Sequence, residues 1–141
     1  MTLKKLLLYI LFFAAVTSSS GQVVGKIFDA EYANENFGSV ISSVVISNIE
    51  LREMLEKAGT YIMLNIDTGN IRALDENRTP VHGTAESENE VFYKISTSRI
   101  ELLFEKGGEK NTTIEMRPEI LTLTNGEFTL DLTWPCPPYC D

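Results

Sequence analysis

The sequence is poor in the residues that catalytic and metal sites use most often. Among its 141 residues there is one histidine, His82, and there are two cysteines, Cys136 and Cys140. It also contains no glycine-rich phosphate-binding loop, no H-E-x-x-H sequence and no G-x-S-x-G sequence. Because each common catalytic chemistry needs several such groups together, we predict no catalytic residue, no metal ligand and no cofactor-binding residue.

Basic residues are also scarce. The chain has 12 Lys and Arg against 20 Asp and Glu, which gives a formal charge of −8. Binding to nucleic acid or anionic lipid requires clustered basic residues, so this acidic composition argues against either partner. The densest acidic cluster, residues 86–90, is most simply a solvated loop, because it lacks the D-x-[DN]-x-[DN]-G spacing of a calcium-binding loop.

Long hydrophobic runs are absent except near the first residue. An apolar run of eleven residues, 6–16, follows Lys4 and Lys5 and precedes small residues, which is the layout of a secretory signal peptide. A membrane-spanning helix needs about 20 apolar residues, so an uncleaved anchor or a buried helix is the weaker alternative. We therefore predict a signal peptide at 1–21 and one secreted or periplasmic domain at 22–141, without membrane insertion. Removal of the signal peptide takes away two lysines and leaves a formal charge of −10.

What the sequence does contain is a regular succession of strand and helix patterns. Seven segments are rich in β-branched residues or alternate apolar with polar residues: 40–47, 60–66, 71–74, 91–95, 112–116, 120–124 and 127–133. Two further segments, 47–59 and 96–108, carry apolar residues at helical spacing. Because sequential hairpins favour antiparallel pairing, we predict an α+β fold. In it, a mainly antiparallel sheet of about seven strands has two short helices packed on one face.

The two helical segments resemble each other at a spacing of 49 residues. At this spacing their apolar stripes coincide, and these stripes are Leu51, Met54, Leu55 and Ala58 in the first segment and Ile100, Leu103, Phe104 and Gly107 in the second. A spacing of 51 aligns S-x-I-E-L in both segments but takes the stripes out of phase. The pattern is that of a degenerate duplicated strand-helix-hairpin unit. The alternative is two unrelated amphipathic helices with ordinary caps.

The two cysteines lie in the sequence Cys136-Pro137-Pro138-Tyr139-Cys140. In an oxidising compartment two thiols this close tend to form a disulfide, so a disulfide-closed tail is our main prediction. Bridged Cα atoms lie within about 7 Å of each other. The segment must therefore fold back, through a helical turn or through a cis peptide bond at Pro137 or Pro138.

Two alternatives use the same thiols for chemistry. Thiol redox catalysis usually has the spacing C-x-x-C, with the first cysteine at a helix N-terminus, whereas the spacing here is C-x-x-x-C. Two thiolates would also hold a soft metal such as Cu(I), and C-P-x-x-C resembles the copper-binding loop of thioredoxin-like copper-delivery proteins. That resemblance covers only these few residues. It implies a distant histidine and a thioredoxin fold, which the rest of the sequence does not show.

A third alternative is a small hydrolase in which His82 activates a serine such as Ser87. A single loop histidine without the serine-elbow sequence is usually a surface side chain. Asn77 and Asn111 begin N-x-[ST] sequences and would carry glycans in a eukaryotic secretory pathway. The short signal that begins with lysines favours a bacterial envelope instead.

The function that these patterns favour is binding rather than catalysis. An exported, acidic single domain without catalytic groups predicts a non-enzymatic module that binds a protein or another envelope component. Trp134 and Tyr139 would form its contact patch, because aromatic rings carry much interface energy; the alternative is that they pack the tail onto the sheet. The thiol or soft-metal protein and the small hydrolase stay open as alternative functions.

Overall fold

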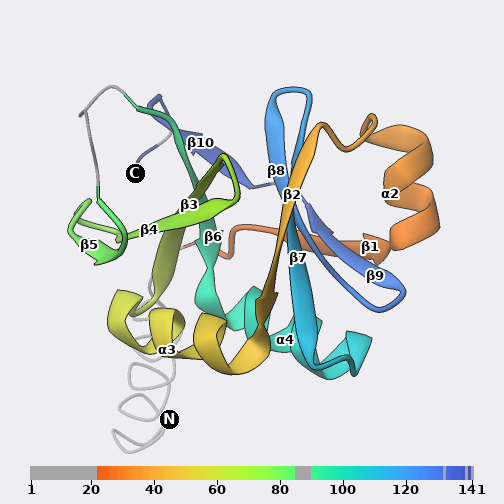
Figure 1. The fold of residues 1–141 in the computed structure, drawn as a ribbon, viewed down its shortest axis with the longest axis horizontal. Coiled ribbons are helices and arrows are strands. Elements are labelled where there is room, and N and C mark those ends of the chain that lie inside the picture. The colour runs from red at the N-terminus through yellow and green to blue at the C-terminus, as the bar shows by residue number, and fades with distance from the viewer. Residues whose placement is uncertain (1–21, 85–89, 132, 139, 141) are drawn as a thin grey trace, which may run out of the picture.

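The computed structural model describes residues 22–84, 90–131, 133–138 and 140, and the predicted signal peptide lies outside them. Within these residues the chain forms three helices and ten strands (Figure 1). The helices are α2 (Ala30–Asn36), α3 (Asn48–Ala58) and α4 (Thr97–Gly107). The strands are β1 (Lys26–Asp29), β2 (Ser42–Ser47), β3 (Tyr61–Asp67), β4 (Asn70–Asp75), β5 (Pro80–His82), β6 (Phe92–Ser96), β7 (Asn111–Arg117), β8 (Ile120–Asn125), β9 (Phe128–Asp131) and β10 (Trp134–Cys136).

The strands form two antiparallel sheets of five strands each, rather than the single seven-stranded sheet that we predicted. Sheet A has the order β1-β9-β8-β7-β2, and sheet B has the order β10-β6-β3-β4-β5. The prediction of an antiparallel α+β fold is confirmed, and the prediction of one sheet is wrong. Alternation along a strand indicates which face is buried but does not specify the neighbouring strand, so it cannot give the number of sheets.

The helices also differ from the prediction. In Figure 1, α3 and α4 lie across one end of both sheets, so they do not pack on one face of one sheet. The predicted apolar stripes do face the core, and Leu51 and Ile100 are fully buried. The short helix α2, which the periodicity did not predict, packs on the outer face of sheet A. It has only seven residues, too few for an apolar stripe to repeat.

The chain has two similar halves, β2-α3-β3-β4 and β6-α4-β7-β8, and the first strand of each half pairs with the hairpin of the other. β2 precedes α3 but pairs with β7, whereas β6 precedes α4 but pairs with β3. The registers match, because Ser47 lies opposite Asn111 in sheet A and Ser96 lies opposite Tyr61 in sheet B. The helices correspond at a spacing of 49 residues, as the stripes predicted. The hairpins β3–β4 and β7–β8 correspond at a spacing of 50, since the second helix–strand connection is one residue longer.

A shared hydrophobic core lies between the two sheets and the two long helices. Inward-facing residues of both sheets contribute to it, including Ile62 and Leu64 from β3 and Ile114 from β7. Tyr93 from β6 also belongs to this core. Its burial, with a smaller contribution from the negative charge of Glu119, raises the pKa of Tyr93 above its ordinary value of 10.0.

Equivalent serines precede the two long helices but have different partners. The backbone N–H of Glu50 donates to Ser47 Oγ at 3.2 Å, which is the N-cap bond that the sequence predicted for α3. Ser96 Oγ makes no cap bond and instead accepts from the N–H of Val24 at 2.7 Å. The N–H of Ser96 in turn donates to the Val24 carbonyl oxygen at 3.0 Å. The segment before β1 therefore occupies this end of the outer edge of β6.

A buried arginine fastens α2 and its following loop to the outer face of sheet A. Arg117 donates to the Gly38 carbonyl oxygen at 2.7 Å and to Asn34 Oδ1 at 3.0 Å. It also donates to Glu115 Oε2 at 2.9 Å and to Thr122 Oγ1 at 3.1 Å. Because Arg117 is only 1% exposed, these partners compensate a charge that water does not reach.

Candidate functional site

The four edge strands of the two sheets are protected to very different degrees. Edge strands present unpaired backbone groups, and proteins commonly shield them with charge, proline or short length. β5 and β10 have three residues each and contain Pro80 and Pro135, and β1 has four residues with Lys26 and Asp29 at its ends. β2 has six residues, Ser42–Ser47, with no charge and no proline. It is therefore the one long, unshielded edge among the strands of the described residues.

Two apolar side chains of β2 and the residues before it face solvent. Ile41 is 67% exposed and Val45 is 65% exposed. On the opposite face of the strand, Ile46 is buried and Val44 is partly buried against the core. Isolated exposed apolar residues are common on proteins, but here two of them flank an open edge.

The backbone of β2 turns every second N–H and C=O away from β7. The N–H of Asn48 donates to the Lys110 carbonyl oxygen at 2.9 Å, which sets the alternation for the preceding strand. By this alternation Ser43 and Val45 point both N–H and C=O to the free side. Ser47 points only its N–H there, because the carbonyl oxygen of this N-cap residue accepts the first hydrogen bond of α3. The second half confirms the same alternation, because Ser96, equivalent to Ser47, bonds outward to the segment before β1.

The equivalent edge in the second half is occupied. β10 pairs antiparallel with β6, so that Trp134 lies opposite Lys94 and Cys136 lies opposite Phe92. Pro135 falls between them, at a position where an antiparallel pair has no ladder hydrogen bond, so its missing N–H costs nothing there. At the spacing of 49, Lys94 and Phe92 correspond to Val45 and Ser43 of β2. In the part of the chain that the structure describes, β2 has no strand in the place that β10 takes beside β6.

A groove between α3 and α4 begins where β2 ends. It has a volume of about 1290 Å³, and Ser47, Asn48 and Ile49 line it at the β2 end. Ile49 is 71% exposed, which extends the apolar surface of β2 onto the first turn of α3. Across the groove, Arg52 Nε lies 3.1 Å from Glu101 Oε1 in an exposed ion pair. Such exposed pairs contribute little stability.

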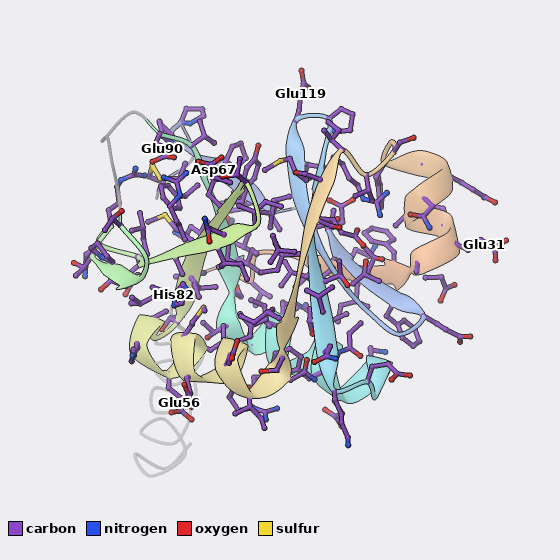
Figure 2. The ribbon with its side chains drawn as sticks, viewed as in Figure 1. Glu31, Glu56, Asp67, His82, Glu90 and Glu119 are labelled. Atoms are coloured by element: carbon purple, nitrogen blue, oxygen red, sulfur yellow. A yellow bond between two sulfur atoms is a disulfide. The ribbon has the colours of Figure 1, made fainter. Side chains whose placement is uncertain are left out.

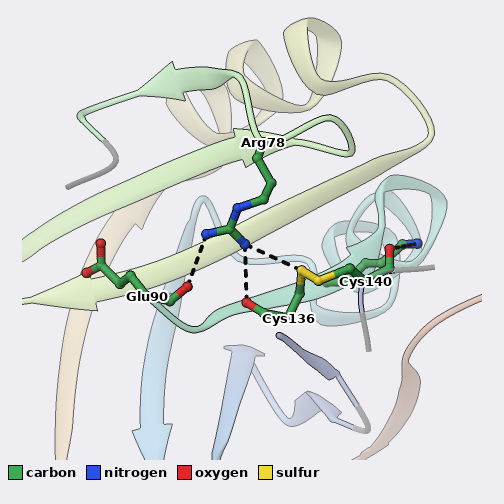
Figure 3. Close-up of a disulfide and its surroundings, with 5 residues drawn as sticks. Arg78, Glu90, Cys136 and Cys140 are labelled. Atoms are coloured by element: carbon green, nitrogen blue, oxygen red, sulfur yellow. Dashed lines mark hydrogen bonds between the residues drawn. A yellow bond between two sulfur atoms is a disulfide. The ribbon is translucent and has the colours of Figure 1, made fainter. Parts of the chain in front are cut away.

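Of the residues predicted to act in the tail, the structure describes Trp134, Cys136 and Cys140. Cys136 Sγ and Cys140 Sγ form a disulfide bond (Figure 3). The peptide bonds before Pro137 and Pro138 are both cis. Trp134 is partly buried within β10. Tyr139 lies outside the described residues, so the predicted patch of Trp134 and Tyr139 stays a prediction.

His82 lies in the edge strand β5, is exposed and pairs in register with Ala73 (Figure 2). A small cavity beside it is lined by Asp67, Arg72 and Thr84 among others, and no serine of the described residues lines it. Ser87, which we considered as a nucleophile, lies outside the described residues. The described geometry therefore gives the hydrolase alternative no assembled nucleophile and base.

The acidic residues do not gather into a metal site within the described ranges. No three His, Cys, Asp or Glu side chains lie close enough there to hold an ion. Figure 2 shows Glu31, Glu56 and Glu119 on separate parts of the molecule, pointing outward. None of the helices in the described part of the chain has the length and apolar character needed to cross a membrane. Asn77 and Asn111, the two sequon residues, are both exposed.

No family model, no curated protein and no solved structure matches this chain. A functional assignment consequently depends on the geometry alone. Sequence patterns identified β2 as a strand but missed it as a site, although its lack of charge and proline was a usable signal. Its position at an open edge follows only from the exchange of strands between the two halves.

Proposed function

We propose that this protein is an exported, non-enzymatic module that binds a partner protein by taking an extended segment of the partner as an added antiparallel strand beside β2. The observation that carries the proposal is the contrast between the two equivalent edges, because β10 fills the edge of β6 whereas none of the described strands fills the edge of β2. The matched registers of the two halves also support a duplicated strand-helix-hairpin unit, in which both first strands inherit the same edge geometry.

The open edge offers both hydrogen bonds and apolar contact to an added strand. The outward backbone groups of Ser43, Val45 and Ser47 would pair with the main chain of the partner, as in other sheet-extending complexes. Side chains of the added strand would then cover Val45 and Ile41, and full burial of such a side chain contributes about 1.5–3 kcal/mol. Main-chain pairing gives affinity at this site, and the exposed apolar side chains give it selectivity.

The chemistry of β2 restricts the partner segment. No residue of Ser42–Ser47 is charged, so a segment with charges facing β2 would lose hydration without gaining an ion pair. We therefore expect an uncharged segment with β-branched or aromatic residues at alternate positions. Proline is acceptable in it only at positions without a ladder hydrogen bond, as Pro135 demonstrates in β10.

A display library of random seven-residue segments tests this binding mode directly, whatever the identity of the partner. We expect the purified protein to enrich uncharged, β-branched and aromatic segments. Val45→Pro should weaken the recovered peptides about tenfold or more, because it removes one outward N–H and fixes the backbone while leaving the β7 ladder intact. Val45→Thr keeps the N–H and the branched shape and is the matched control.

A second pair of variants protects the test against local misfolding. Val45→Lys places a charge on the open edge, and Val91→Lys makes the same change at an exposed valine outside β2. Only the first should abolish peptide binding. Equal binding by both variants would remove the support for β2. A concentration-dependent dimer that Val45→Lys dissociates would show that the occupant is a second copy of the chain rather than a partner.

A further inference from the structure

The guanidinium of Arg78 lies against the Cys136–Cys140 disulfide (Figure 3). Arg78 Nη1 lies 3.4 Å from Cys136 Sγ and donates to the Cys136 carbonyl oxygen at 3.3 Å. Lys94 Nζ donates to the Cys140 carbonyl oxygen at 3.1 Å. Lys94 is itself 7% exposed, so this bond holds the Cys140 end of the tail to β6 at a largely buried position.

Arg78 is held in this position by more than its contact with the sulfur. Its backbone has φ of +62°, a left-handed conformation that a non-glycine residue adopts at some cost. Its Nη2 donates to the Glu90 carbonyl oxygen at 3.1 Å, and its guanidinium lies 5.5 Å from the centre of the Phe92 ring. Arg72 lies 5.6 Å from the same ring but directs its guanidinium to the Glu90 carboxylate. The guanidinium of Arg78 is thus aimed at one sulfur atom by contacts from separate segments of the chain.

The two sulfur atoms differ in access. Cys136 is fully buried in β10, whereas Cys140 is only partly buried. An incoming thiolate must approach a disulfide from outside along the S–S axis, so we assign the attack to Cys140, the less buried of the two residues. The departing atom is then Cys136 Sγ, which is the one beside Arg78.

We propose that Cys136–Cys140 is a thiol–disulfide exchange site, in which external thiols attack Cys140 Sγ and Arg78 stabilises Cys136 Sγ as the leaving thiolate. A guanidinium beside a sulfur favours the thiolate over the thiol, and a better-stabilised thiolate leaves faster. This inference uses only residues of sheet B and its tail, so it stands or falls independently of strand binding at β2.

The exchange balances as a two-electron transfer from an external dithiol. Its first thiolate forms a bond to Cys140 Sγ as the Sγ–Sγ bond breaks, and the electron pair of that bond goes to Cys136 Sγ. The second thiolate of the reagent then attacks the reagent sulfur in the mixed disulfide and releases Cys140 as a thiolate. The reagent leaves as its cyclic disulfide, and the two cysteine thiolates take up protons from water according to pH.

The position of attack is measured with the purified protein and glutathione. A brief exposure to glutathione is quenched with iodoacetamide, and the modified residues are located by peptide mass spectrometry. We expect glutathione on Cys140 and the carbamidomethyl group on Cys136. Glutathione predominantly on Cys136 would overturn the assignment of the leaving sulfur, and so would equal labelling of the two cysteines.

The role of Arg78 is measured from the rate of reduction by dithiothreitol. Arg78→Gln should slow reduction about tenfold, the lower end of what a hydrogen bond to a charged group contributes. Arg78→Lys keeps the positive charge and should stay within about threefold of the original rate. Arg72→Gln is the matched control, because it removes the other guanidinium beside Phe92, and it should leave the rate within about twofold.

Loss of structure in the tail would change the rate of disulfide reduction in the opposite direction. If Arg78 only packed the tail, Arg78→Gln would expose the disulfide and reduction would be faster. An unchanged or faster rate in Arg78→Gln therefore overturns the proposal, and so does an equal slowing in Arg72→Gln. Rescue of the rate by Arg78→Lys separates a charge effect from a packing effect.

Discussion

The first strands of the two halves, β2 and β6, have the same local geometry and opposite surroundings. Each precedes a long helix, each pairs with the first hairpin strand of the other half, and each turns the same alternate residues outward. β6 receives β10 and the segment before β1 on its outer side, whereas β2 receives nothing from the described residues. A repeated scaffold therefore provides two equivalent edges, and the described part of the chain fills only one of them.

The comparison extends to the outer faces of the sheets. Sheet A is covered by α2, which Arg117 holds through a buried polar network. Sheet B is covered by the disulfide tail, which packs on a small apolar cluster containing Met63, Leu74 and Phe92. The two halves thus have similar core-facing elements, and they differ in the elements that cover the outer faces of their sheets. Differences between equivalent positions can therefore be tested by paired substitutions.

The largest difference is expected between Arg117 and its equivalent, Asp67. Arg117→Met should destabilise the protein by about 3–5 kcal/mol, because it leaves the largely buried Glu115 without its partner. Asp67→Asn changes an exposed side chain at the end of β3 and should leave the denaturation midpoint nearly unchanged. Urea unfolding of both variants checks this, and similar midpoints would show that the network does not hold α2 in solution.

A smaller difference is expected at the last position of the helix stripes, where α3 has Ala58 and α4 has Gly107. A Cβ at Gly107 would collide with the side chain and backbone oxygens of Asn125, so Gly107→Ala should cost about 1–3 kcal/mol. The reverse change, Ala58→Gly, should cost about 1 kcal/mol from helix propensity. Thermal unfolding gives both values. A stabilised Gly107→Ala variant would mean that α4 and the β8–β9 turn separate more readily than their contact indicates.

The next largest difference in stability is expected between substitutions of the two serines that precede the long helices. Ser96→Ala leaves the buried N–H of Val24 without its acceptor and should cost about 1–2 kcal/mol. Ser47→Ala removes an N-cap bond at the exposed start of α3 and should cost about 1 kcal/mol or less. Hydrogen exchange at Val24 distinguishes the two, since only Ser96→Ala should increase its rate. Unaltered protection of Val24 in that variant would contradict the role we give to Ser96.

The smallest effect concerns Tyr93, which occupies the position equivalent to Val44. Its pKa is raised in the folded state, mainly by burial, so the folded protein keeps this proton at a pH where the unfolded chain loses it. Stability from this group is fully present below the unfolded pKa and is lost as the pH rises through the folded pKa. Tyr93→Phe should therefore lose less stability than the original protein between about pH 9 and pH 11, as measured by urea unfolding. Parallel curves for the two proteins would exclude this contribution.

Much of the local structure could be predicted from the sequence. The stripes from Leu51 and from Ile100 predicted both long helices and their correspondence at 49 residues, because a helix must keep one face in the core. Gly59 ends α3 and Gly126 lies in the β8–β9 turn, where positive φ favours glycine. The fold-back at Pro137 and Pro138 was also anticipated, since bridging cysteines four residues apart requires it.

The candidate sites could not be predicted in the same way. The pattern of Val40–Ser47 predicts a strand, but nothing in those residues says that β7 would be its only neighbour among the described strands. Arg78 and Lys94 lie 58 and 46 residues from the cysteines that they contact, and no short-range pattern connects such positions. The third helix was missed for a different reason, because α2 is stabilised by contacts with sheet A rather than by its own periodicity.

The sequence by itself determined the secondary structure of most segments, the burial of two helix stripes and the closeness of two cysteines. These features follow from side-chain periods and short-range geometry, which act within a few residues. The tertiary structure alone decided that strands are exchanged between the halves, that the edge of β2 is open, and that a guanidinium meets one sulfur of the disulfide. Such pairings depend on burying surfaces from distant parts of the chain together, and the free energy of that burial belongs to the assembled core rather than to any one segment.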